Sequence, residues 1–137
     1  MFTYNTFVKL NDTDSAGVLF FANIFNLAHE AYERWLDSIG CSISTILNES
    51  DYILPIVHSE ADYKRPMRVG DEVNIKISLE SINGSGYTLN YQFVDKDGQT
   101  TAFVKTGHVV LDKESMGRTE LSKQLRNALM LLDSRNI

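Results

Sequence analysis

The stretch that decides the fold is Phe21–Gly40, which reads FANIFNLAHEAYERWLDSIG. Its large side chains recur every three or four residues, which is the period of a helix with one buried face. The residues on this predicted face are Phe25, His29, Tyr32, Trp35, Leu36 and Ile39. Gly40 marks the helix end, because glycine readily adopts the left-handed conformation that closes many helices. The sequence therefore predicts one long helix whose apolar face needs a partner layer.

Most of the remaining chain predicts strands. Residues 3–10 alternate loosely between apolar and polar side chains, which is typical of a strand. After a short predicted helix at 42–49, four further segments have strand character, namely 52–66, 71–82, 87–94 and 100–112. NGSG at 83–86 and DKDG at 95–98 predict tight turns, so the strands that they join are antiparallel. With a last helix at 119–132, the order predicts an α+β fold in which one antiparallel sheet wraps one long helix.

The totals fit one globular domain over residues 1–137. Hydrophobic residues make up 43% of the chain and charged residues 23%, and the net charge of −5 argues against a general nucleic-acid binder. The single cysteine, Cys41, excludes an internal disulfide and a CxxC motif. The start MFTYNTFVKLNDTD lacks the basic and apolar regions of a signal peptide, and no apolar stretch is long enough to span a membrane. We therefore expect a cytoplasmic protein.

The segment before the long helix, NDTDSAGVLFF at 11–21, has two carboxylates and a glycine. A calcium loop that started at Asp12 would need ligands at its fifth and twelfth positions, which are Ala16 and Asn23. The segment therefore matches a calcium loop of the EF-hand type poorly. Two hypotheses remain for these aspartates, helix capping and catalysis.

The catalytic hypothesis depends on the residues between the aspartates and the helix. Gly17 permits a close backbone approach, and the start of a helix presents unpaired N–H groups with a partial positive charge. Such donors can hold a developing oxyanion while a nearby carboxylate attacks a carbonyl or activates water. These residues do not by themselves choose between Asp12 and Asp14.

This same region carries a family resemblance. DTDSAGVLFFANIFNLAHEAYERWL resembles the D-x-D-x-x-G-V-x-(F/Y)-(F/Y) signature of hotdog-fold acyl-CoA thioesterases of the 4-hydroxybenzoyl-CoA thioesterase family. The likeness continues through LPIVHSEADYKRPMRVGDEV and covers nearly the whole chain. Within the family, DTDSAGV, HEAYERWL and LPIVHS are most similar to the 1,4-dihydroxy-2-naphthoyl-CoA hydrolases of phylloquinone and menaquinone synthesis.

The resemblance implies a hotdog fold and a thioesterase acting on an aromatic acyl-CoA. It implies that Asp14 is the catalytic carboxylate, as nucleophile or as general base, with Gly17 in its motif and the N–H near Phe21 polarising the thioester carbonyl. It also implies a homodimer or homotetramer with active sites between subunits. Coenzyme A would be part of the substrate, so no separate cofactor is expected. The alternatives are a thioesterase for 4-hydroxybenzoyl, short or fatty acyl groups, and a non-catalytic subunit that binds acyl-CoA.

The resemblance also suggests substrate-binding residues. Some family members carry bases around the hairpin before the fourth strand, but here that hairpin, SINGSGYT, has none. Ser85 and the flanking glycine backbone are then the expected phosphate donors, with Lys64, Arg65 and Arg68 as further candidates. His58 and Ser59 are expected to pair with ring hydroxyls. The aromatic residues that offer a surface for the ring are Phe20, Phe21, Phe25, Tyr32 and Tyr63.

Other chemistry finds no support in the sequence. His29 and Glu30 begin an H-E-x-x-H pattern, but Glu33 stands where the second histidine would be, so no metal is expected. We predict His29 as a hydrogen-bonded core residue and His108 as a structural strand residue. No G-x-S-x-G motif is present, which argues against a serine hydrolase.

Overall fold

The predicted strands form a five-stranded antiparallel sheet. In the computed structural model, which describes residues 1–133, the strand order is β1-β4-β5-β6-β3. The strands are β1 (Phe2–Phe7), β3 (Ile56–Tyr63), β4 (Glu72–Ile82), β5 (Gly86–Val94) and β6 (Thr100–Val109). Residues on β4 and β5 alternate between buried and partly exposed, as a sheet with one covered face requires.

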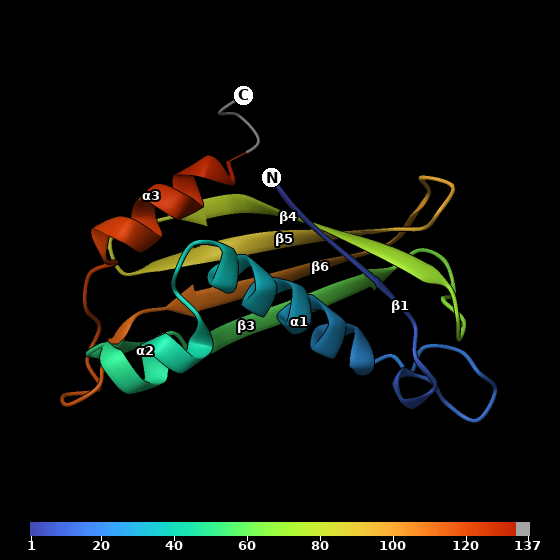
Figure 1. The fold of residues 1–137 in the computed structure, drawn as a ribbon, viewed down its shortest axis with the longest axis horizontal. Coiled ribbons are helices and arrows are strands. Elements are labelled where there is room, and N and C mark those ends of the chain that lie inside the picture. The colour runs from blue at the N-terminus through green and yellow to red at the C-terminus, as the bar shows by residue number, and fades with distance from the viewer. Residues whose placement is uncertain (134–137) are drawn as a thin grey trace.

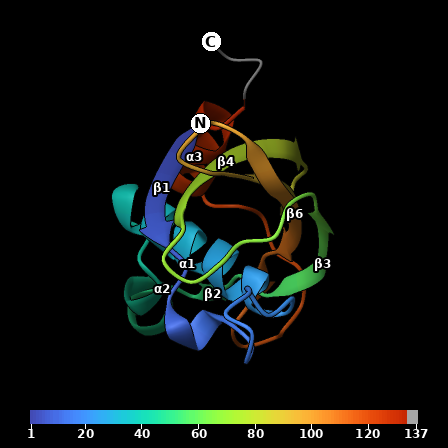
Figure 2. The same cartoon turned by 90° about the vertical axis from the view of Figure 1, so that its right-hand side faces the viewer.

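The long helix α1 (Asn23–Ser38) packs into the concave face of this sheet, and the sheet curls around it (Figures 1 and 2). This arrangement confirms the α+β prediction with one wrapped helix. The predicted buried face was partly wrong, since Phe25, His29 and Ile39 are only partly buried. The buried residues are Ile24, Leu27, Ala28, Ala31, Tyr32, Trp35 and Leu36. The small alanines allow the helix to approach the sheet closely, whereas the sequence pattern gave most weight to the large aromatic side chains.

Two predicted strands are each interrupted. The segment 52–66 divides into β2 (Tyr52–Ile53) and β3, and 100–112 divides into β6 and β7 (Leu111–Asp112). β2 and β7 pair with each other as a separate two-stranded sheet. Pro55 lies at the first break, where it has no N–H to donate to a neighbouring strand. Val110 lies at the second break and donates its N–H to the carbonyl of Ser85 at 2.9 Å.

Three further helical segments complete the fold, namely η1 (Leu10–Asp12), α2 (Ile43–Glu49) and α3 (Lys123–Leu131). α3 lies beside the end of β4 (Figure 1), and its Leu125 and Leu129 are fully buried. The N–H of Leu79 donates to the carbonyl of Leu132 and ties this end of the chain to β4.

β3 forms one edge of the sheet. All of its residues except Ala61 are exposed, and Val57 is 63% exposed although it is apolar. The strand therefore presents apolar side chains and unpaired backbone groups at an open edge, which proteins commonly cover with another chain.

Candidate active site

Asp14 lies in a tight loop between residues 13 and 19, directly before α1. Its N–H donates to the carbonyl of Val18 at 2.8 Å, and its Oδ1 accepts the N–H groups of Ala16 at 2.8 Å and Val18 at 3.2 Å. Gly17 donates its N–H to the carbonyl of Asp14 and has φ +77°, a conformation that favours glycine. The loop thus fixes one carboxylate oxygen. Among residues 1–133, the other oxygen, Oδ2, has no hydrogen-bond partner, and the side chain is exposed.

Asp12 has different surroundings. It is buried, and its Oδ2 accepts the N–H of Lys9 at 2.9 Å and lies 3.2 Å from the Lys9 ammonium. Its carbonyl accepts the N–H of Phe20 and the side-chain amide of Asn23, both at 3.0 Å, which joins η1 to the start of α1. Neither aspartate caps α1, because the cap residue is Ala22 without any side-chain hydrogen bond. The capping hypothesis was therefore wrong for α1, and both carboxylates bind N–H groups of the preceding segment instead.

A free donor lies directly before α1, at Phe21. No acceptor for the N–H of Phe21 is found within the described part of the chain, and its side chain is 65% exposed. The hydroxyl of Tyr63 donates to the carbonyl of Phe21 at 2.5 Å and joins the end of β3 to this position. A cavity of about 240 Å³ lies here, lined by Phe21, Tyr63, Lys64 and Arg65 among others. The structure thus brings the predicted Arg65 next to Phe21.

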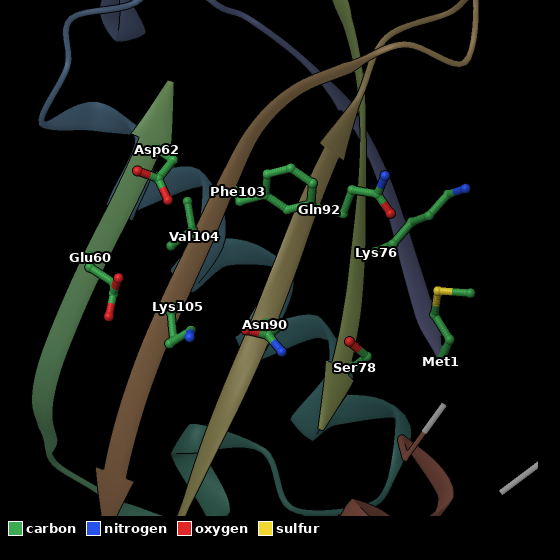
Figure 3. Close-up of a pocket in the computed structure, with 10 residues that line it drawn as sticks. All are labelled: Met1, Glu60, Asp62, Lys76, Ser78, Asn90, Gln92, Phe103, Val104 and Lys105. Atoms are coloured by element: carbon green, nitrogen blue, oxygen red, sulfur yellow. The ribbon is translucent and has the colours of Figure 1, made fainter. Parts of the chain in front are cut away.

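The structure does not bring His58 and Ser59 together. Successive residues on a strand point to opposite faces of the sheet. His58 lies on the outer face, where its Nε2 is 2.9 Å from Oε1 of Glu60. Figure 3 shows Glu60 and Lys105 on this outer face, in front of the strands, with helical ribbon behind them. Ser59 faces α1 and lies opposite Thr106 of β6.

A second cavity, which we call the inner cavity, lies between α1 and the sheet and has a volume of about 230 Å³. Its lining residues are Phe25, Asn26, His29, Ile56, Ser59, Tyr91 and Thr106. His29 was predicted as a core residue, but its side chain is 43% exposed, with Nδ1 3.8 Å from Oε2 of Glu33. Sequence reasoning missed Asn26, Tyr91 and Thr106 as candidates. The alternation along β5 and β6 was the available signal, because it places Tyr91 and Thr106 on the covered face.

A buried polar cluster lies beneath the inner cavity. The hydroxyls of Tyr91 and Thr106 are 2.8 Å apart, and Oγ1 of Thr106 is 2.7 Å from Nε2 of His108. Burial, with a smaller effect of nearby His29, lowers the pKa of His108 to about 3. Burial also raises the pKa of the Tyr91 hydroxyl. This cluster is therefore neutral at physiological pH.

Ser85 lies far from Asp14 within one chain. The turn between β4 and β5 that carries Ser85 is at the opposite end of the sheet from the loop before α1 (Figure 1). The N–H of Ser85 is occupied by Oδ1 of Asn83 at 2.9 Å. Sequence reasoning missed Arg126 of α3, whose guanidinium donates to the carbonyls of Asn83 at 3.0 Å and Gly84 at 3.5 Å. A base thus reaches a turn that has none of its own, from a helix about forty residues away in sequence.

Metal-binding and membrane-spanning features are both missing from residues 1–133. No three His, Cys, Asp or Glu side chains are grouped there so that they could hold a metal ion. No helix in this part of the chain has the length and apolar character needed to cross a membrane.

Comparison with known proteins supports the family resemblance. Residues 8–129 match the thioesterase-like superfamily. A 1,4-dihydroxy-2-naphthoyl-CoA hydrolase of Rippkaea orientalis is 34% identical over 124 residues, which cover 89% of this chain and 90% of the relative. A hydrolase of the same name from Prochlorococcus marinus strain NATL1A is 36% identical over 128 residues, which cover 88% and 85%. The crystal structure of a 1,4-dihydroxy-2-naphthoyl-CoA thioesterase from Synechocystis has a TM-score of 0.88 at 30% identity, and the match covers 94% of this chain and 95% of that one. The resemblance is thereby confirmed, and this chain belongs to the thioesterase-like superfamily.

Proposed function

We propose that this chain is a thioesterase that hydrolyses 1,4-dihydroxy-2-naphthoyl-CoA. The observation that carries the proposal is the nearly full-length match to relatives named for this hydrolysis. The site supports it, because an exposed carboxylate on a fixed loop and a free helix-start N–H lie on one short segment, at Asp14 and Phe21. These are the two groups that acyl transfer needs.

Each group has a defined role in the proposed reaction. The N–H of Phe21 donates to the thioester carbonyl oxygen and stabilises the negative charge that develops on it. In one route Oδ2 of Asp14 attacks the carbonyl carbon, the coenzyme A thiolate leaves, and water then hydrolyses the mixed anhydride and restores the carboxylate. In the other route Oδ2 takes a proton from the water that attacks the carbonyl carbon, and the thiolate leaves as the tetrahedral intermediate collapses. Oδ1 remains bound to the N–H groups of Ala16 and Val18 and holds the carboxylate in place.

We also propose that the active unit is a homodimer, or a tetramer built from such dimers, paired through β3. The start of β3 lies near the turn that carries Ser85, since Pro55 accepts the N–H of Val109 and Gly86 lies opposite Val109. The end of β3 lies at Phe21 through Tyr63. Antiparallel pairing of two β3 strands therefore places the Ser85 turn of one copy near the Asp14 end of the other. Coenzyme A would then contact Ser85 of one copy and Arg65 of the other.

The cytoplasmic location and the independence from metals and cofactors remain predictions. Activity after dialysis against a chelator tests the second of these directly. Loss of turnover with chelator and its recovery with zinc or magnesium would contradict it.

The decisive experiment compares Asp14→Asn with Asp14→Ala. An asparagine side chain still offers an oxygen to the N–H groups of Ala16 and Val18, so the loop keeps its shape while the anion is lost. We expect turnover of 1,4-dihydroxy-2-naphthoyl-CoA to fall about 10²- to 10⁴-fold or more in Asp14→Asn. Asp14→Ala should lose stability as well, because the two loop hydrogen bonds go with the side chain.

Asp12→Asn is the matched control. It removes the ion pair with Lys9, so it should lower stability while leaving most turnover in place. Wild-type turnover in Asp14→Asn would contradict the mechanism. A panel of acyl-CoAs tests the substrate, and a higher kcat/KM for palmitoyl-, acetyl- or 4-hydroxybenzoyl-CoA than for the naphthoyl thioester would contradict the substrate assignment alone. No hydrolysis of any thioester would indicate a binding subunit.

A further inference from the structure

The inner cavity has a polar floor and apolar walls. Phe25 of α1 and Ile56 of β3 supply apolar surface, while the hydroxyls of Tyr91, Thr106 and Ser59 come from three neighbouring strands. Ser59 and Thr106 lie directly opposite each other on β3 and β6. A cavity of this kind fits a flat apolar group that carries an oxygen atom on one edge.

We propose that Tyr91 and Thr106 determine substrate specificity by donating a hydrogen bond to a ring hydroxyl of the bound aromatic acyl group. This inference rests on the proposed function and assigns the acyl group to the inner cavity. It gives to Tyr91 and Thr106 the role that the family resemblance suggested for His58 and Ser59. Of these two, His58 lies on the other face of the sheet.

The buried cluster holds more donor hydrogens than internal hydrogen bonds. Tyr91, Thr106 and neutral His108 together carry three hydrogens that they can donate, but only two hydrogen bonds join them. One donor is therefore left over. Its position depends on which ring nitrogen of His108 carries the hydrogen.

The surroundings of His108 decide between the two positions. If Nδ1 carried the hydrogen, that N–H would be buried without a partner, because Nδ1 contacts no acceptor among the described residues. Buried N–H groups without a partner are rarer in proteins than buried acceptors without one. With the hydrogen on Nε2, His108 donates to Thr106, and the spare hydrogen belongs to the hydroxyl of Thr106 or Tyr91.

The spare hydrogen then lies at the wall of the inner cavity. Both Tyr91 and Thr106 line this cavity, and both are almost fully buried, so their hydroxyls have little access to bulk water. An oxygen atom of a bound ligand is the natural acceptor. An analogue without that oxygen leaves the donor unpaired, and sites built to bind a substrate hydroxyl reject such analogues strongly.

The test measures selectivity rather than activity. Selectivity is measured as the ratio of kcat/KM for 1-hydroxy-2-naphthoyl-CoA to kcat/KM for 2-naphthoyl-CoA. We expect wild type to prefer the hydroxylated thioester, and Thr106→Val and Tyr91→Phe each to reduce the ratio about tenfold, as the loss of one buried hydrogen bond implies. Thr106→Ser keeps the hydroxyl and should keep the ratio.

Thr101→Val is the matched control, because Thr101 is another buried threonine of β6 that does not line the inner cavity. It should leave the ratio unchanged. An unchanged ratio in both Thr106→Val and Tyr91→Phe would overturn the inference, as would an equal reduction in Thr101→Val. Two variants are used so that poor folding of one does not remove the test.

A binding experiment separates this inference from the proposed function. Calorimetric titration with 1-hydroxy-2-naphthoic acid and with 2-naphthoic acid needs no turnover. Tighter binding of the hydroxylated acid that is lost in Tyr91→Phe supports the inference even if no thioester is hydrolysed. Equal binding of the two acids to the wild-type protein would overturn it even if the thioesterase activity is found.

Discussion

The buried His108 should make the stability of this protein fall on mild acidification. Its side chain is 2% exposed, and its ring stacks on Tyr87 with centroids 4.8 Å apart and lies 4.6 Å from Tyr32. Burial, and then the charge of nearby His29, lowers its pKa from the ordinary 6.5 to about 3. The groups that face it from α1 and β5 are another histidine and tyrosines, and no carboxylate contributes to the shift of its pKa.

Proton binding sets the sign and the size of this effect. Between pH 6.5 and about 3 the unfolded chain binds a proton on His108 that the folded chain does not. The free energy of unfolding therefore falls as the pH falls through this window, and this contribution is complete only above pH 6.5. Each pH unit well below 6.5 corresponds to about 1.4 kcal/mol, but at pH 6.5 His108 is still only half protonated in the unfolded chain, so we expect a loss of roughly 2 kcal/mol between pH 6.5 and pH 4.5.

The assay is urea unfolding of wild type and His108→Phe at several pH values and one fixed protein concentration, because oligomers unfold in a concentration-dependent way. Phenylalanine keeps the stacking on Tyr87 and Tyr32 but cannot bind a proton. The carboxylates and histidines that the two proteins share contribute equally to the pH dependence of both. Their contributions therefore cancel in the difference between the two unfolding free energies. That difference should shift by roughly 2 kcal/mol toward the variant from pH 6.5 to 4.5. A difference that stays constant over this range would refute the reasoning.

Two other predictions concern the packing of α2 and the edge of the sheet. Lys113→Met should lower the free energy of unfolding by about 1–3 kcal/mol, because the Lys113 ammonium donates to the carbonyls of Ile46, Leu47 and Ser50 at the end of α2. Urea unfolding measures this, and an equal effect of replacing the exposed turn residue Lys96 would show that the three contacts contribute nothing. Val57→Glu should convert the proposed oligomer to monomer in light scattering, because it places a charge at an exposed apolar position of the edge strand β3. An unchanged oligomer mass would indicate another interface.

The sequence predicts the fold well where the pattern is local. The alternation along β4 and β5, the turn at DKDG and the period of α1 all concern residues within a few positions of each other, and all three elements are present. The breaks in the predicted strands depend on tertiary contacts instead. β6 ends where Val110 bonds to Ser85, a partner 25 residues away that no local pattern reveals.

The difference between local patterns and tertiary contacts also explains which predicted site residues lie together in the structure. Asp14, Gly17 and Phe21 lie on one short segment, so the sequence motif already brings them close together, and the structure places them in one loop and the start of one helix. His58 and Ser59 are adjacent in sequence, yet the period of the strand sends them to opposite faces. Residues that are close in sequence can therefore be expected to share a site when they lie in a loop, but not when they are neighbours on a strand.

The groups assigned to the reaction and those assigned to acyl recognition lie on different elements. The first lie before and at the start of α1, whereas the hydroxyls that recognise the acyl group lie on the inner face of β5 and β6. Tyr91 and Thr106 bond to each other and to His108, and no hydrogen bond joins them to the Asp14 loop among the described residues. Substitutions at Tyr91 or Thr106 can therefore alter which acyl group fits while the carboxylate and the helix-start N–H keep their geometry. The edge strand β3 links the two regions, because Ser59 and Ile56 line the inner cavity and Tyr63 contacts Phe21. Pairing of this strand with a second copy would hold both regions in place at once, which is a physical reason for a thioesterase of this fold to work as an oligomer.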